Sequence, residues 1–162
     1  MLELRQLAEA VGATLERRES ADVAWNRVAD LARWLQPKYR DVTVLKAALP
    51  LVATEEFLSR AQQEAESEKL PLATFAQLGV GIVHLCASQE ILSPNLAAWI
   101  SRLRKAATDL KGTLVIEQCA AELKSQVDVW GAQGDDLGAM RKLKTAWDPQ
   151  AVLSPGRFVD GI

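Results

Sequence analysis

The sequence is poor in several features that would point directly to a function. It has two cysteines, one histidine and no basic excess, because 19 Lys and Arg stand against 21 Asp and Glu. Without a basic excess we expect no nucleic-acid-binding surface. No apolar run approaches the ~20 residues that a membrane-spanning helix needs. The N-terminus begins directly on an amphipathic pattern, so no signal peptide is predicted.

The scarcity of cysteine and histidine also limits the chemistry of the chain. Cys86 and Cys119 lie far apart in apolar runs, which predicts two buried thiols in a reducing compartment and hence a cytoplasmic protein. The single histidine, His84, has no second histidine for a base–orienter pair, and no Ser-His-Asp arrangement stands out. The simplest prediction for His84 is a partly buried strand residue with a backbone partner.

What is present is an ordinary globular composition. The chain has 162 residues, of which 49% are hydrophobic, and this length is enough for a single domain with a real core. We predict a helical N-terminal segment over 1–40, a core over 41–120, and a C-terminal helix and tail over 121–162. The N-terminal segment holds one helix ending at Gly12, a weak edge strand over 13–18, and a second helix from Asp22 to before Pro37.

The central part alternates strand and helix patterns. Strands are predicted over 42–49, 72–77, 82–87 and 113–116, from their β-branched and aliphatic residues. One helix is predicted to start with Thr54 as its cap, and another with Ser93-Pro94. Their expected buried residues are Phe57, Leu58, Ala61 and Ala65 in the first, and Leu96, Trp99, Ile100, Leu103, Ala107 and Leu110 in the second.

The order strand, helix, strand, strand, helix, strand is the ferredoxin-like βαββαβ pattern of an α+β fold. Both helices would cover one face of an antiparallel sheet. The other face would need a partner, from the N-terminal helices or another domain. The pair Gly79 and Gly81 joins two strands and does not open a helix, so it is not a phosphate-binding loop.

The C-terminal segment over 121–162 forms one connected pattern. A helix beginning at Asp135 and Asp136 carries Leu137, Met140, Leu143 and Trp147 and ends at Asp148-Pro149, and the turn Ser154-Pro155-Gly156-Arg157 follows. Pro155 and Gly156 define the backbone at Arg157, whose guanidinium could hold a carboxylate or phosphate bidentately. The alternative is an exposed arginine near a frayed terminus.

This connected pattern resembles the C-terminal signature of the FAD-linked oxidases of the vanillyl-alcohol oxidase type. It is similar in particular to the E-type, FAD-binding component of bacterial glycolate oxidase, which has Asn where this chain has Ser154. In that family the tail returns to the flavin domain near the cofactor. The resemblance therefore implies that Arg157, Ser154 and His84 contact the substrate or the flavin domain, and it implies no catalytic residue on this chain.

The segment before His84 is similar to a metal-binding motif of related D-lactate and D-2-hydroxyacid dehydrogenases, which read His-x-Gly-Asp-Gly-Asn-x-His and use a later Glu. His84 matches the second histidine, Gln77 stands in place of the first, and Val80 in place of the Asp. Glu117 lies near the later acid. The resemblance implies a degraded metal site at Gln77, His84 and Glu117, with no metal bound.

The function implied is that of a C-terminal cap, or substrate, domain of a longer FAD-dependent 2-hydroxy acid oxidase, with glycolate as the leading substrate. FAD would bind a separate domain of the same polypeptide, so this chain alone would be inactive. Further expected partners are other glycolate oxidase-like subunits, which could bring membrane association, and a second copy through exposed apolar surface.

Two other functions fit a ferredoxin-like domain. One is a stand-alone ligand-binding or assembly module. The other is an acylphosphatase-like enzyme, which needs an anion-binding loop between the first strand and its helix. We find no such loop in that segment, so this alternative is weak.

Overall fold

The computed structural model describes residues 6, 8–12, 41–89, 95–131 and 134–162. The chain divides into two compact units, residues 1–31 and 32–162. In the first unit, a helical turn over 8–10 is followed by a turn at Val11 and Gly12, where the helix was predicted to end. The predicted strand over 13–18, the second helix and the Ser93-Pro94 start lie outside the described residues. The domain boundaries at 40 and 120 stay predictions.

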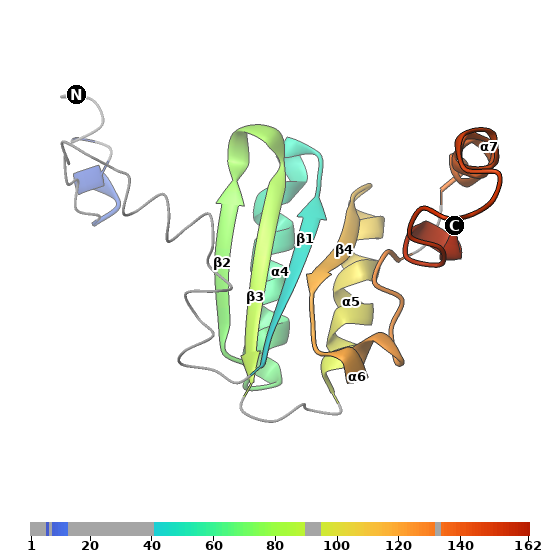
Figure 1. The fold of residues 1–162 in the computed structure, drawn as a ribbon. Helices are drawn as coiled ribbons and strands as arrows, with labels where there is room; N and C mark the ends of the chain where they lie inside the picture. Colours follow the sequence, from blue (N-terminus) through green and yellow to red (C-terminus); the bar gives the residue numbers. More distant parts are fainter. Residues whose placement is uncertain (1–5, 7, 13–40, 90–94, 132–133) are drawn as a thin grey trace, which may run out of the picture. The chain divides into compact units, whose positions relative to one another are not determined.

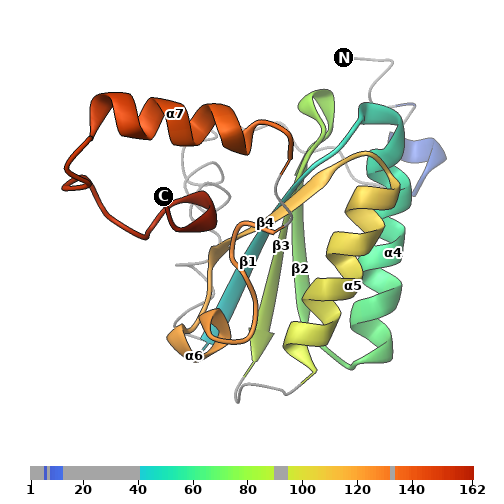
Figure 2. The same cartoon turned by 90° about the vertical axis from the view of Figure 1, so that its right-hand side faces the viewer.

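The second unit is built on a four-stranded sheet in the order β2-β3-β1-β4, in which every neighbouring pair is antiparallel. Helices α4 and α5 lie side by side on one face of this sheet (Figures 1 and 2). The α+β, ferredoxin-like βαββαβ fold predicted from the sequence is therefore confirmed. The elements are β1 (Asp41–Ala48), α4 (Thr54–Ser67), β2 (Leu72–Gln77), β3 (Ile82–Gln89), α5 (Leu96–Asp109) and β4 (Thr113–Gln118).

The core lies between the sheet and the two helices. Leu45 and Ala47 of the central strand β1 are fully buried there, because alternate residues of a strand point to the same face. The helices supply the opposing apolar stripes, and nearly all the residues predicted for them are buried. They are Phe57, Ala61 and Ala65 of α4 and Leu96, Trp99, Ile100, Leu103 and Ala107 of α5, while Leu58 and Leu110 are only partly buried.

The opposite face of the sheet is also partly shielded. Val42 and Val44 of β1 and Cys86 of β3 are at most 7% exposed. Burial, with a smaller contribution from the negative charge of Glu117, raises the pKa of the Cys86 thiol to about 11. Cys119 is only half-buried, and burial raises its pKa as well. The prediction of two buried thiols is therefore correct for Cys86 and wrong for Cys119.

One local prediction fails at a helix. Thr54 is not the cap of α4 but its first residue, because a 3-10 turn, η1 (Leu51–Ala53), runs directly into the helix. Its hydroxyl donates to the carbonyl of Pro50 at 3.4 Å.

Helix α7 (Leu137–Trp147) begins after Asp136 as predicted, but none of its residues is buried. Two short elements complete the chain, α6 (Ala121–Lys124) and η3 (Val159–Gly161). Among the described residues, no helix combines the length and hydropathy needed to cross a membrane.

Gly81 closes the hairpin between β2 and β3, after the 3-10 turn η2 (Leu78–Val80). Its φ is +70°, and a Cβ at this position would lie 2.0 Å from the carbonyl oxygen of Leu49. The same two residues are joined by a hydrogen bond from the Leu49 N–H to the Gly81 carbonyl at 2.9 Å. Only glycine fits both the left-handed conformation and the close approach.

We therefore expect Gly81→Ala to lower the free energy of unfolding by roughly 2 kcal/mol or more, because a left-handed residue with a Cβ costs about 1–2 kcal/mol before any clash. Urea denaturation measures this change. Gly79→Ala is the matched control, since Gly79 has open space at its Cβ. Equal midpoints for the two variants would show that the Leu49 contact does not constrain the hairpin.

Candidate functional site

The face of the sheet opposite the helices carries a small polar group, which we call the sheet-face cluster: Lys46, Phe75, His84 and Glu117. The four strands contain only three formally charged residues, and two of them belong to this cluster. His84 is the register partner of Lys46 on one side and of Phe75 on the other. Antiparallel pairing thus brings together three residues that are far apart in the sequence.

Glu117 follows the alternation of β4 onto the same face and lies at an irregularity in the strand. Leu45 pairs with Ile116 while the preceding Val44 pairs with Gln118, so Glu117 is the extra residue of a β-bulge. Bulges re-aim side chains and are common next to functional sites. The result is a carboxylate from an edge strand that contacts residues of β1 and β3.

The cluster is held by short contacts. Glu117 Oε2 lies 3.3 Å from His84 Nδ1, and its Oε1 lies 3.6 Å from Lys46 Nζ. The Phe75 ring stacks on the imidazole, with centroids 6.0 Å apart and planes inclined by 27°. The His84 side chain is 23% exposed, so solvent or a ligand can reach it. The ring partner is therefore a carboxylate and not the expected backbone group, and it supplies the orienting group that the sequence appeared to lack.

The described residues fit neither a metal nor the phosphates of a dinucleotide. His84 and Glu117 are two donors where catalytic metals usually take three protein ligands, and the Lys46 ammonium already neighbours the same carboxylate. Gln77 is the register partner of Ile82, not of His84. Gly79 and Gly81 belong to a hairpin and open no helix, as predicted.

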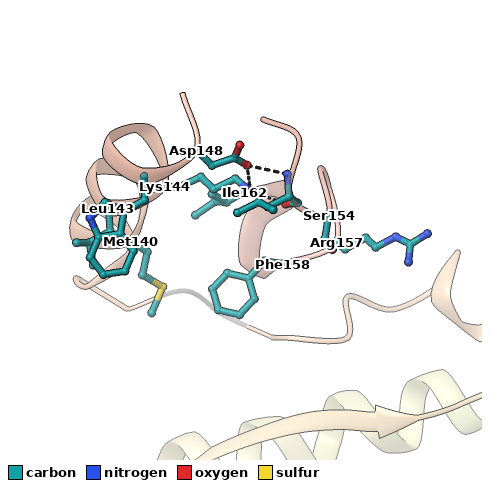
Figure 3. Close-up of a pocket in the computed structure, with 10 residues that line it drawn as sticks. Met140, Leu143, Lys144, Asp148, Ser154, Arg157, Phe158 and Ile162 are labelled. Carbon is teal, nitrogen blue, oxygen red and sulfur yellow. Dashed lines mark hydrogen bonds and ion pairs between the residues drawn. The ribbon is translucent and has the colours of Figure 1, made fainter. Parts of the chain in front are cut away.

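The second candidate region is the tail after α7, which is organised by Asp148 (Figure 3). The Asp148 carboxylate accepts hydrogen bonds from the N–H groups of Val152 and Leu153, at 2.9 and 3.0 Å. Lys144 Nζ lies 2.7 Å from the same carboxylate and donates to the Leu153 carbonyl at 2.6 Å. The hydrogen bond from Lys144 and then those from the backbone hold the pKa of Asp148 below its usual value.

Between α7 and the tail lies an apolar groove of about 450 Å³, which we call the tail groove. Trp147 is 83% exposed and Leu153 64% exposed, so this groove is open apolar surface. Its apolar lining consists of Met140, Leu143, Trp147, Leu153, Phe158 and Ile162. The Phe158 ring also packs edge-on against Trp130, with centroids 5.1 Å apart.

The two predicted tail residues lie together at the rim of this groove. The Ser154 carbonyl accepts a hydrogen bond from the Arg157 N–H at 3.2 Å, and the Arg157 side chain points away from the groove (Figure 3). No described residue forms an ion pair with this guanidinium. Ser154 has a φ of +47°, a conformation that asparagine adopts more readily than serine. No hydrogen bond, ion pair or ring contact joins His84 to either residue within the described ranges.

Sequence reasoning missed Lys46, Phe75 and Asp148. Lys46 carried one signal, because it is the only cation in its strand pattern, but nothing in the linear sequence paired it with Glu117. In the sequence, Asp148 before Pro149 predicts only the end of a helix. Its role depends on the turn that brings the backbone of Val152 and Leu153 to the carboxylate.

Comparison with known protein families identifies a match over most of the chain. Residues 3–158 match the family described as FAD linked oxidases, C-terminal domain. No curated protein sequence matches the chain.

We expect Asp148→Asn to loosen the tail, because it removes the charge that pairs with Lys144 and weakens the acceptor for two backbone N–H groups. Hydrogen exchange at Val152 and Leu153 should accelerate by roughly tenfold. Asp109→Asn is the control, since Asp109 also pairs with a lysine four residues away, Lys105, but accepts no backbone bond.

The same tail should loosen in acid. Because the pKa of Asp148 is lowered in the folded chain, its contribution is complete above the ordinary carboxyl pKa of about 3.9. It is lost as the pH falls through the lowered value. Protection at Leu153 that is the same in Asp148→Asn as in the unmodified chain would show that the carboxylate does not order the tail.

Proposed function

Because the chain belongs to the family of FAD linked oxidases, C-terminal domain, we propose that it is the cap, or substrate, domain of an FAD-dependent 2-hydroxy acid oxidase or dehydrogenase. The similarity of the tail to that of the FAD-binding component of glycolate oxidase makes glycolate the leading substrate. The FAD would be held by a separate domain of the same polypeptide. When bound there, FAD supplies the acceptor for the hydride of the alcohol carbon.

The observation that carries this proposal is the sheet-face cluster. A 2-hydroxy acid has a carboxylate and a hydroxyl on adjacent carbons, and the cluster offers an ammonium and an imidazole on adjacent paired strands. Lys46 would bind the carboxylate, since an exposed ammonium is a good partner for a single anion. Phe75 provides an apolar wall beside the imidazole.

His84 would contact the hydroxyl. The Glu117 carboxylate, 3.3 Å from Nδ1, favours a proton on that nitrogen, which leaves Nε2 of the neutral ring as the acceptor. An imidazole in this state accepts a hydrogen bond from an alcohol and can take its proton. Stacking on Phe75 fixes the ring plane, so that the acceptor direction is defined before a substrate arrives.

The tail would contact the flavin domain. Its groove exposes large apolar side chains on a helix with no buried residue, which is typical of a surface that meets another protein domain. Arg157, with no ion-pair partner among the described residues, would bind an acidic group of that domain or the substrate carboxylate. Burial of the Arg157 guanidinium between the two domains would strengthen its contact, because a bidentate charged pair is stronger away from water.

The single histidine makes ligand binding at the cluster directly measurable. We expect glycolate to shift the side-chain ¹⁵N resonances of His84 saturably, with affinity in the ~millimolar range for a small ligand held by few contacts. Acetate, which lacks the 2-hydroxyl, should cause smaller shifts. Lys46→Met should weaken glycolate binding by roughly tenfold, the loss expected for one ion pair.

The matched control is Lys142→Met, which removes an exposed lysine of α7 outside the cluster and should leave the titration unchanged. Equal shifts with glycolate and acetate, or equal affinity in Lys46→Met, would contradict the proposed role of the cluster. A stoichiometric yellow complex of this chain with FAD would contradict the assignment of flavin binding to another domain.

A further inference from the structure

The two edges of the sheet differ in the hydrogen bonds that other described residues make to them. At β4, the Ile116 N–H donates to the Val129 carbonyl at 2.8 Å, and Arg104 Nε donates to the Leu114 carbonyl at 3.3 Å. The β4 edge is therefore covered by a loop and by an arginine. At the other edge, β2 pairs with β3 on one side, and no described residue bonds to its outer backbone groups.

Strand β2, which follows directly after Pro71, itself lacks the devices that normally keep a strand from pairing with another chain. Natural edge strands carry charges, prolines or bulges for this purpose. From Leu72 to Val83 the sequence has no charged residue and no proline, and the register with β3 is continuous. Thr74 and Gln77, the exposed residues of β2, are uncharged.

An apolar patch continues this edge at the hairpin end. It consists of Leu51, Val52, Leu78 and Val80, which are between 59% and 94% exposed. The two turns that carry them, η1 and η2, contact each other. The edge strand and the patch together form one uncharged surface, which we call the β2 edge surface.

We propose that two copies of this chain associate through the β2 edge surface, with β2 pairing antiparallel to β2 of the second copy about a two-fold axis. A self-complementary interface brings a residue near its own symmetry mate, so that any charge close to the axis would repel itself. A surface without charge meets this condition. Main-chain hydrogen bonds between edge strands supply the affinity.

The geometry follows from the alternation of side chains. A two-fold axis perpendicular to the sheet keeps both copies of α4 and α5 on one face and both sheet-face clusters on the other. Paired residues then point to the same face, and the residue nearest the axis pairs with its own symmetry mate. A register centred on Thr74, in the middle of β2, meets this condition. In that register Leu78 of one copy lies opposite Leu70 of the other, so the patch covers the start of the partner strand.

Sedimentation equilibrium on the chain tests this proposal, which does not depend on the proposed function. We expect a dimer of twice 17.7 kDa with a Kd in the ~micromolar range. Thr74→Lys places two ammonium groups near the axis and should raise the Kd at least about tenfold. Leu143→Lys, a charge introduced on exposed apolar surface of α7, is the matched control and should leave the Kd unchanged.

Hydrogen exchange gives a readout that does not need a variant to fold. Outward-facing amides of β2 should gain protection as the concentration of the unmodified chain rises, whereas the Ile116 amide, bonded within the chain, should not change. A chain that stays monomeric at all concentrations would overturn the proposal. A dimer that survives Thr74→Lys and is lost in Leu143→Lys would overturn it as well, by moving the contact to the tail groove.

Discussion

The pairing of β1 with β3 on one side and with β4 on the other is the interaction on which the rest of this structure depends. The register of these two ladders decides at once which residues enter the core and which gather on the opposite face. A slip by one residue would turn Lys46 toward α4 and α5 and Leu45 away from them. Because the two helices must bury Leu45 and Ala47, the same burial that stabilises the fold holds Lys46 beside His84.

The candidate functional surfaces follow from this constraint to different degrees. The sheet-face cluster is tied directly to the register, and Glu117, at the bulge in β4, adds its carboxylate. The tail is held by a separate local device, the Asp148 carboxylate with its backbone and lysine partners. In the proposed cap domain, the residues that face the substrate would therefore be in place before the substrate binds. The apolar side chains of the tail groove would be covered only by another domain.

The sequence predicts the elements better than it predicts the site. The apolar stripes of α4 and α5 and the β-branched strands follow local periodicity, so the βαββαβ order could be inferred without coordinates. The contact between Glu117 and His84 leaves no local signal, because it depends on strand order, and only the resemblance to the metal motif of the dehydrogenases placed these two residues together. Helix α7 shows what local periodicity leaves open. Its pattern predicts an apolar face correctly, but periodicity does not say whether a partner within the chain covers Leu143 and Trp147.

We propose that the face bearing Lys46, His84 and Glu117 is the substrate side of a flavin oxidase. A crystal structure of these residues together with their flavin-binding domain and a bound 2-hydroxy acid tests it most directly. We expect the sheet-face cluster to lie opposite the isoalloxazine ring, with the substrate carboxylate at Lys46 and its hydroxyl at His84. A structure in which α4 and α5 face the flavin, or in which the substrate touches neither residue, would contradict it.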